Sequence, residues 1–227
     1  MKKTYIGIAF IVLVFGIWAV PTIVERVKTS DIVRGERLDH VGGGETSGKL
    51  DRIGPAPKYS LVDQHGRPFS SDALKGKVHV LEFFFSTCPT ICPIMNQNLK
   101  LVEQKFFGNP DFAIVSITIN PEHDTPQVLK EHAEAIGVKS SQWHFLSGEK
   151  DYIYKLSNTG FNIYAGQNAN ASGGFEHSGL FALIDRDGYI RCRKDDFGNP
   201  ILYYDGTEAA GVEAIMQDIK ILLDEQR

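Results

Sequence analysis

The sequence predicts a mixed α/β domain, and three observations lead to this fold class. Residues 78–85 and 112–119 are nearly continuous apolar runs, as expected of strands that are buried on both faces of a sheet. Residues 93–107 repeat apolar side chains with a helical period, which indicates a helix with one buried face. Two short apolar runs flank the sequence Asp-Arg-Asp-Gly at 185–188, a turn signal typical of a β-hairpin.

The other elements follow in chain order. A hairpin is predicted at 58–69, because Asp63 and Gly66 supply turn residues between two short runs. A helix is predicted to begin near Pro126, where Asp124 or Thr125 can act as the N-cap. The remaining predicted elements are a strand at 143–146, a helix at 150–159, the hairpin strands at 180–184 and 189–193, and a helix at 207–224. This order is that of a thioredoxin-like fold, here with an N-terminal hairpin extension.

The N-terminal segment has the composition of a membrane anchor. Residues 4–24 carry no charged side chain and are long enough to cross the roughly 30 Å hydrocarbon core of a bilayer. Lys2 and Lys3 precede the segment, whereas the charges after it nearly cancel, so the N-terminus is expected in the cytoplasm. We therefore predict a single transmembrane helix at 1–24. A cleaved signal peptide is the alternative, although no convincing cleavage site is present.

The rest of the chain divides into a tether and a domain. Residues 25–50 are polar and rich in glycine, which predicts a flexible tether, and residues 51–227 are enough for one domain. No Arg- and Ser-rich transit segment is present, so we expect a bacterial inner membrane, with the C-terminal domain on the periplasmic or exported side. The net charge of −4, without a run of Lys or Arg, argues against nucleic acid as a partner.

Two of the three cysteines, Cys88 and Cys92, lie four residues apart where the strand at 78–85 gives way to a helix. At that spacing two sulfurs can bind one metal ion or form a disulfide. Redox enzymes of this fold use two intervening residues rather than three. A peroxidase pattern would need Thr at 85 or 89, where the chain has Phe85 and Pro89. The spacing therefore favours a soft metal such as Cu(I) or Zn(II), or an iron–sulfur cluster.

Two thiolates leave a metal incompletely coordinated, and a histidine is the expected third ligand. Of the seven histidines, His177 follows a loop at 167–174 and precedes the strand at 180–184. In a thioredoxin-like fold that junction lies beside the cysteine turn. A packing or capping role for His177 is the alternative. Four others have ordinary surface or core explanations: His40 lies in the tether, His65 in the entrance turn, His79 within a strand, and His132 is expected on the polar side of its helix.

Three segments resemble the SCO/SenC family of copper chaperones. They are Phe-Phe-Phe-Ser-Thr-Cys-Pro-Thr-Ile-Cys-Pro at 83–93, Asn-Pro-Glu-His-Asp-Thr-Pro at 120–126, and His-Ser at 177–178 followed by Leu-Ile-Asp at 183–185. The resemblance extends from residue 53 to 223. It implies that Cys88, Cys92 and His177 bind copper, as Cu(I) or Cu(II). The implied role is to help build the dinuclear copper centre of cytochrome c oxidase subunit II, or to serve another copper protein.

The resemblance also directs attention to residues around the site. Asp124 is expected either to orient His177 or the cysteine loop, or to cap a helix. Glu176 stands where the family usually has Asp, and Cys192 where glycine is expected. We interpret Cys192 as a small buried side chain, with mixed-disulfide pairing as the alternative. An extra segment at 194–202 is expected to lengthen the C-terminal hairpin.

Binding and transfer of copper, rather than turnover, is thus the leading functional prediction. The rival is a thiol-disulfide oxidoreductase, in which Cys88 and Cys92 reduce cysteines of the oxidase subunit before metal is loaded. The two hypotheses differ over His177, which a dithiol shuttle does not require. A copper or redox sensor that signals through a partner is a third class, and nothing in the sequence singles it out.

Overall fold

The computed structural model of the chain describes residues 49–225. The predicted anchor at 1–24 and all but the end of the predicted tether at 25–50 lie outside the described residues. Leu50, at the end of that tether, is buried in the domain core. Among residues 49–225, no helix has the length and apolar character that crossing a membrane requires.

Three parallel strands form the centre of the sheet. They are β4 (Val78–Phe84), β5 (Phe112–Thr118) and β6 (Trp143–Ser147), and every residue of β4 and β5 is buried. Continuous burial explains why these segments lack the polar alternation of a half-exposed strand. The strands predicted at 78–85, 112–119 and 143–146 are therefore confirmed to within one residue at either end.

Antiparallel strands extend the sheet on both sides of this centre. Its order is β1-β10-β9-β4-β5-β6-β2-β3, with two short strands, β11 and β12, added to β10 and β9. The added strands are β1 (Asp51–Pro55), β2 (Ser60–Asp63), β3 (Pro68–Ser70), β9 (Leu180–Ile184), β10 (Tyr189–Lys194), β11 (Pro200–Ile201) and β12 (Tyr204–Asp205). The predicted hairpins at 58–69 and 180–193 are confirmed, and pairing of β10 with β11 shows that the segment at 194–202 lengthens the second hairpin.

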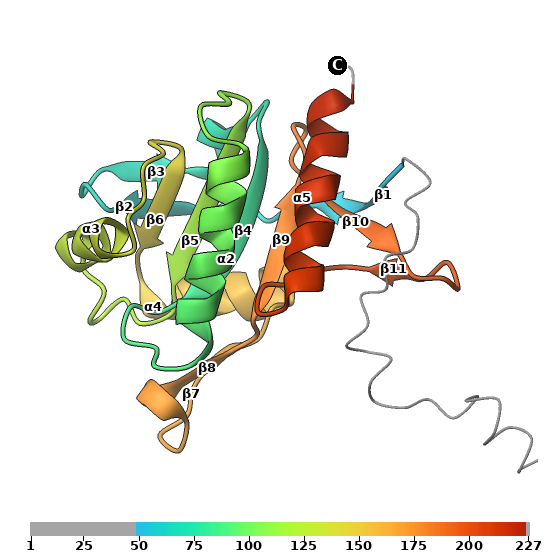
Figure 1. The fold of residues 1–227 in the computed structure, drawn as a ribbon. Coiled ribbons are helices and arrows are strands. Elements are labelled where there is room, and N and C mark those ends of the chain that lie inside the picture. Colours follow the sequence, from blue (N-terminus) through green and yellow to red (C-terminus); the bar gives the residue numbers. More distant parts are fainter. Residues whose placement is uncertain (1–48, 226–227) are drawn as a thin grey trace, which may run out of the picture. The chain divides into compact units, whose positions relative to one another are not determined.

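Helices cover both faces of the sheet. α2 (Ile91–Lys105) and α5 (Ala209–Asp224) lie side by side on one face, and α4 (Lys150–Lys155), continued by a π-helical turn at Leu156–Phe161, lies on the other (Figure 1). α3 (Pro126–Ala135) packs against β6. α2 and α3 connect successive parallel strands, and right-handed crossovers in one direction put both on the same face. The mixed α/β, thioredoxin-like architecture predicted from the sequence is confirmed.

The edge strand β1, the short strand β12 and the hairpin of β7 and β8 were missed by the sequence analysis. β1 pairs with β10 at the sheet edge, where Arg-Ile-Gly-Pro lacks both strict alternation and a continuous apolar run. A separate two-stranded hairpin, β7 (Ala165–Gln167) and β8 (Phe175–His177), flanks the loop expected at 167–174, and of that loop only Gln167 belongs to a strand. His177 follows the loop as expected, but it is the last residue of β8 rather than a residue at a loop-to-strand junction. Strands of three residues are too short for periodicity to reveal them.

A buried ion pair joins the C-terminal hairpin to α5. Arg193 of β10 donates from Nε and Nη2 to the Asp218 carboxylate at 2.9 and 2.8 Å, and the Tyr204 hydroxyl donates to the same carboxylate at 2.6 Å. Arg193 is 5% exposed and Asp218 is fully buried. A charge left without its partner at such a depth is strongly destabilising.

We predict that Asp218→Asn lowers the free energy of unfolding by about 3–5 kcal/mol, because it leaves the Arg193 guanidinium buried without a counter-charge. Lys194→Gln is the control, since Lys194 pairs with Asp51 between two partly exposed side chains, and its loss should cost at most about 1 kcal/mol. Urea unfolding followed by circular dichroism measures both. Equal costs for the two substitutions would contradict the prediction.

Candidate metal centre

The cysteine turn is positioned by the end of a buried strand and the start of a helix. β4 ends at Phe84 and α2 begins at Ile91, so Cys88 precedes the helix and Cys92 lies in its first turn. Thr90, the N-cap, makes no side-chain capping hydrogen bond, and the backbone N–H of Cys92 instead donates to the Cys88 sulfur at 3.4 Å. Because the N–H groups of a first helical turn carry partial positive charge, they stabilise a thiolate there.

The third residue reaches the turn from the small hairpin. His177 Nε2 lies 3.0 Å from the Cys92 sulfur, and the ligand atoms of Cys88, Cys92 and His177 all lie within 4.8 Å of one another. The other ring nitrogen, Nδ1, is 3.1 Å from the carbonyl oxygen of Ser178. Donation from Nδ1 to that carbonyl leaves the lone pair of Nε2 facing the sulfurs, as in metal-binding histidines.

The two cysteines differ in pKa, and so in protonation. The hydrogen bond from Cys92, aided by nearby backbone N–H groups, lowers the pKa of Cys88 to about 3 against the opposing effect of burial. The same hydrogen bond to Cys88, together with burial, raises the pKa of Cys92 well above its usual range. At neutral pH Cys88 is therefore the thiolate and Cys92 the proton donor. Metal binding has to displace the remaining proton from Cys92.

Asp124 fixes the start of the cysteine turn. Its carboxylate is fully buried and accepts hydrogen bonds from the Ser86 backbone N–H at 3.1 Å, the Ser86 hydroxyl at 2.5 Å and the Thr118 hydroxyl at 2.5 Å. Thr125, not Asp124, caps α3. Of the roles expected for Asp124, the structure thus selects the cysteine loop. Its described contacts do not include His177.

Aromatic rings hold the imidazole in place, and the sequence analysis did not identify them. The Phe85 ring meets the His177 ring edge to face, with centroids 5.8 Å apart, and also packs against Phe175 at 5.3 Å. Gly173 has a positive φ of 82°, and a Cβ there would collide with the Phe85 ring. The Gly-Gly pair at 173–174 is the signal that could have indicated a sharp turn beside the site.

A groove leads to the sulfurs, and no residue of the β7–β8 hairpin lines it. It has a volume of about 360 Å³, lies between α2 and α3, and is lined in part by Cys88, Cys92, Asn96 and His132. His132 stacks on Phe84 with ring centroids 5.4 Å apart and lies 3.3 Å from the Asn96 amide nitrogen. The expectation that His132 lies on a polar helix face is wrong, because the face of α3 that carries it packs against the sheet and α2.

The remaining residues of interest lie away from the cluster. Cys192 is free and fully buried in β10, where burial raises its pKa to about 11, so the interpretation as a small buried side chain is confirmed. Glu176 is exposed and accepts a hydrogen bond from Asn168 at 2.7 Å. Among the described histidines, only His177 belongs to the group that can hold a metal.

The fold and the site together define a class of protein. A thioredoxin-like domain presents two cysteines, one of them a thiolate, at a strand-to-helix turn, and a histidine faces them from a separate hairpin. Such a protein handles soft metal ions or disulfides.

Comparison with known proteins identifies the family. The family model for SCO1/SenC matches residues 49–208, and the chain belongs to this family, as the resemblance had indicated. An SCO2-like protein of Rickettsia typhi is 31% identical over 153 residues, which are 65% of this chain and 74% of that protein.

Two solved structures show the same fold. BsSco, described as a member of the Sco family of cytochrome c oxidase assembly proteins with a disulfide switch, is 25% identical with a TM-score of 0.64, covering 78% of this chain and 98% of that chain. ScoI of Bradyrhizobium japonicum with copper bound is 25% identical with a TM-score of 0.57, covering 75% of this chain and 99% of that chain.

We predict that Cys88 reacts with iodoacetamide at a nearly constant rate from pH 8 down to about pH 5. Its lowered pKa keeps it a thiolate throughout that range, and the rate should fall only as the pH approaches 3. An ordinary thiol would instead slow about tenfold per pH unit below 8. Mass spectrometry of each labelled cysteine gives the rates, and circular dichroism checks that the fold persists.

Cys88→Ser is the control for that experiment. The variant retains Cys92 and Cys192, and burial both limits access of the reagent and disfavours their thiolates, so it should label slowly at every pH. Half-maximal labelling of Cys88 near pH 8.5 would contradict the prediction.

Proposed function

We propose that this chain is a copper carrier that binds one copper ion through Cys88, Cys92 and His177 and delivers it during assembly of cytochrome c oxidase. The observation that carries the proposal is the convergence of two sulfurs and one imidazole nitrogen within 4.8 Å of one another. Metal bonds to thiolate and imidazole are about 2.0–2.3 Å long, so one ion can reach all three atoms.

The donor set supports copper among the soft metals. Two thiolates and an imidazole suit Cu(I), and three ligands complete a trigonal site. A structural zinc site takes four protein ligands, and no fourth Cys, His, Asp or Glu joins the group among residues 49–225. The copper-bound ScoI structure is a relative in which copper is present on the same fold.

The groove between α2 and α3 supports transfer rather than permanent storage. Cys88 and Cys92 are only 7% and 2% exposed, so a receiving ligand needs a defined approach to the ion. The groove brings solvent to both sulfurs without crossing the His177 hairpin. An acceptor can therefore approach the sulfurs through this groove.

The finer parts of the proposal rest on the sequence. The acceptor is the dinuclear copper site of subunit II, as the family resemblance implies, or another copper protein. Residues 1–24 anchor the chain in a bacterial inner membrane, and residues 25–50 tether the metal-binding domain on the exported side. This topology places the carrier on the side where such a copper site is built.

Thiol-disulfide exchange is a second candidate function, and the lowered pKa of Cys88 favours it. A thiolate beside a protonated thiol is the arrangement that attacks a disulfide and then resolves the mixed intermediate. The disulfide switch described for BsSco belongs to that relative. The two functions separate at His177, which coordinates the ion in the first and is dispensable in the second.

We predict that His177→Ala weakens Cu(I) binding by at least about 100-fold, because a two-coordinate site replaces a three-coordinate one. Cys88→Ser and Cys92→Ser should abolish specific binding. Competition titration against a calibrated Cu(I) chelator measures the affinity, and X-ray absorption reports the number of sulfur and nitrogen ligands.

His65→Ala is the matched control, because His65 lies in the turn between β2 and β3 and outside the metal group. Its affinity should equal that of the unmodified chain. Unchanged Cu(I) affinity and ligand number in His177→Ala would overturn the carrier proposal. Retention of dithiol-dependent reductase activity in that variant would then favour the second function.

A further inference from the structure

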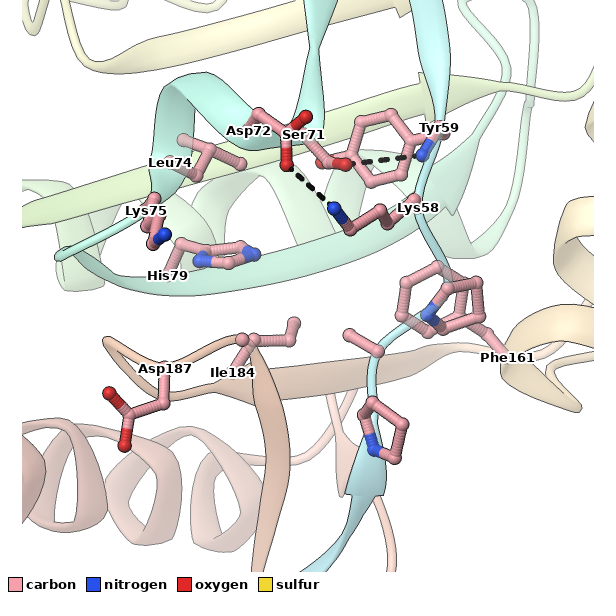
Figure 2. Close-up of a pocket in the computed structure, with 14 residues that line it drawn as sticks. Lys58, Tyr59, Ser71, Asp72, Leu74, Lys75, His79, Phe161, Ile184 and Asp187 are labelled. Carbon is pink, nitrogen blue, oxygen red and sulfur yellow. Dashed lines mark hydrogen bonds and ion pairs between the residues drawn. The ribbon is translucent and has the colours of Figure 1, made fainter.

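A cavity of about 250 Å³ lies at the opposite end of β4 from the cysteine turn. Its walls come from the connection between β1 and β2, from the 3₁₀-helix at Ser71–Leu74, from the start of β4 and from the end of β9 (Figure 2). His79 is the second residue of β4, whereas Cys88 follows the end of that strand. The cavity is therefore separate from the metal centre.

Two polar side chains on the cavity wall have hydrogen-bonding capacity that the described residues do not use. His79 is 6% exposed, and its Nδ1 has a partner, the Lys77 carbonyl at 3.4 Å, whereas its Nε2 has none among the described residues. The Tyr59 hydroxyl is buried and has no partner among residues 49–225. Buried polar groups in proteins are nearly always hydrogen-bonded, so the unpaired Tyr59 hydroxyl and the unused Nε2 beside one cavity call for an explanation.

The His79 ring presents a hydrogen-bond acceptor, Nε2, to a ligand in the cavity. Burial lowers its pKa to about 4, so the ring is neutral at physiological pH. Donation from Nδ1 to the Lys77 carbonyl leaves Nε2 with its lone pair, and the ring points into the cavity (Figure 2). A ligand that satisfies Nε2 must therefore bring a donor, such as a hydroxyl group.

The mouth of the cavity carries one uncompensated positive charge. Lys58, on the cavity wall, pairs with Asp72 at 3.1 Å (Figure 2), and Asp187 pairs with Arg52 at 2.7 Å. Lys75 is exposed and forms no ion pair within the described part of the chain. An anionic group at the mouth would complement this lysine.

Between these polar ends the walls are apolar. Leu74, Phe161, Ile184 and two prolines of the connection between β1 and β2, Pro55 and Pro57, line the cavity together with Tyr59. Aromatic, proline and branched aliphatic side chains such as these pack well against the face of a planar apolar ligand. The volume is at the lower end of ligand pockets, so it suits a molecule with one ring.

We propose that this cavity binds a small aromatic acid that carries a hydroxyl group opposite its carboxylate. The hydroxyl donates to Nε2 of His79, the ring lies between the prolines and Phe161, and the carboxylate meets the Lys75 ammonium at the mouth. This site is independent of copper. A bound ligand would also contact both the connection between β1 and β2 and the start of β4, and so hold them together.

The test uses two probes that differ by one group, 4-hydroxybenzoate and benzoate, titrated calorimetrically into the full chain. We expect one site per chain and at least about tenfold tighter binding of 4-hydroxybenzoate, because a site built around a buried acceptor rejects the analogue without the donor. His79→Phe should remove this preference. Lys75→Gln should weaken both probes about tenfold.

Lys130→Gln is the control for charge, since Lys130 is exposed on α3 and does not line the cavity. It should bind both probes as the unmodified chain does. The comparison of the two probes on the unmodified chain, and the surface variant Lys75→Gln, remain informative if His79→Phe does not fold. Absence of saturable binding, equal affinity for the two probes, or equal weakening by Lys75→Gln and Lys130→Gln would overturn the proposal.

Discussion

The interaction on which the site depends is the hydrogen bond from the first turn of α2 to the Cys88 sulfur. A buried strand has to end and a helix has to begin within a few residues, and the helix lacks a capping side chain at Thr90. The Cys88 sulfur accepts the hydrogen bond that a capping side chain would otherwise accept from the first turn of α2. The same atom thus caps the helix and, as a thiolate, is available to bind a metal. Asp124 holds the strand end of this turn through Ser86.

The two sides of the metal group differ in how firmly they are held. The sulfurs belong to a turn between the central strand and a helix that packs on the sheet, and both cysteines are buried. His177 belongs to a hairpin of two three-residue strands that is not part of the main sheet. Fewer backbone hydrogen bonds resist displacement of the hairpin, so the imidazole is the ligand that can leave first while the ion stays on the thiolates.

The strands that are buried along their whole length could be predicted from the sequence, because a continuous apolar run such as 78–85 is typical of them. Cys88 and Cys92 could be predicted because a pair of cysteines where a strand gives way to a helix can bind a metal or form a disulfide. His177 could not be placed at bonding distance without the family resemblance, since two three-residue strands leave no periodic trace. The position of His132 was predicted wrongly because α3 packs against both the sheet and α2, where His132 contacts Phe84 and Asn96. The identity of one polar residue does not reveal such a second packing partner. Asp124 was identified, but only the fold distinguishes support of the turn from capping.

Cys192 gives the domain an internal reporter. It lies in β10 opposite Asp51 of the edge strand β1, fully buried and free. A thiol reagent reaches this fully buried sulfur only when the structure around β10 opens. The rate at which Cys192 is modified therefore measures how often this part of the sheet opens, in the same way that amide exchange measures local opening.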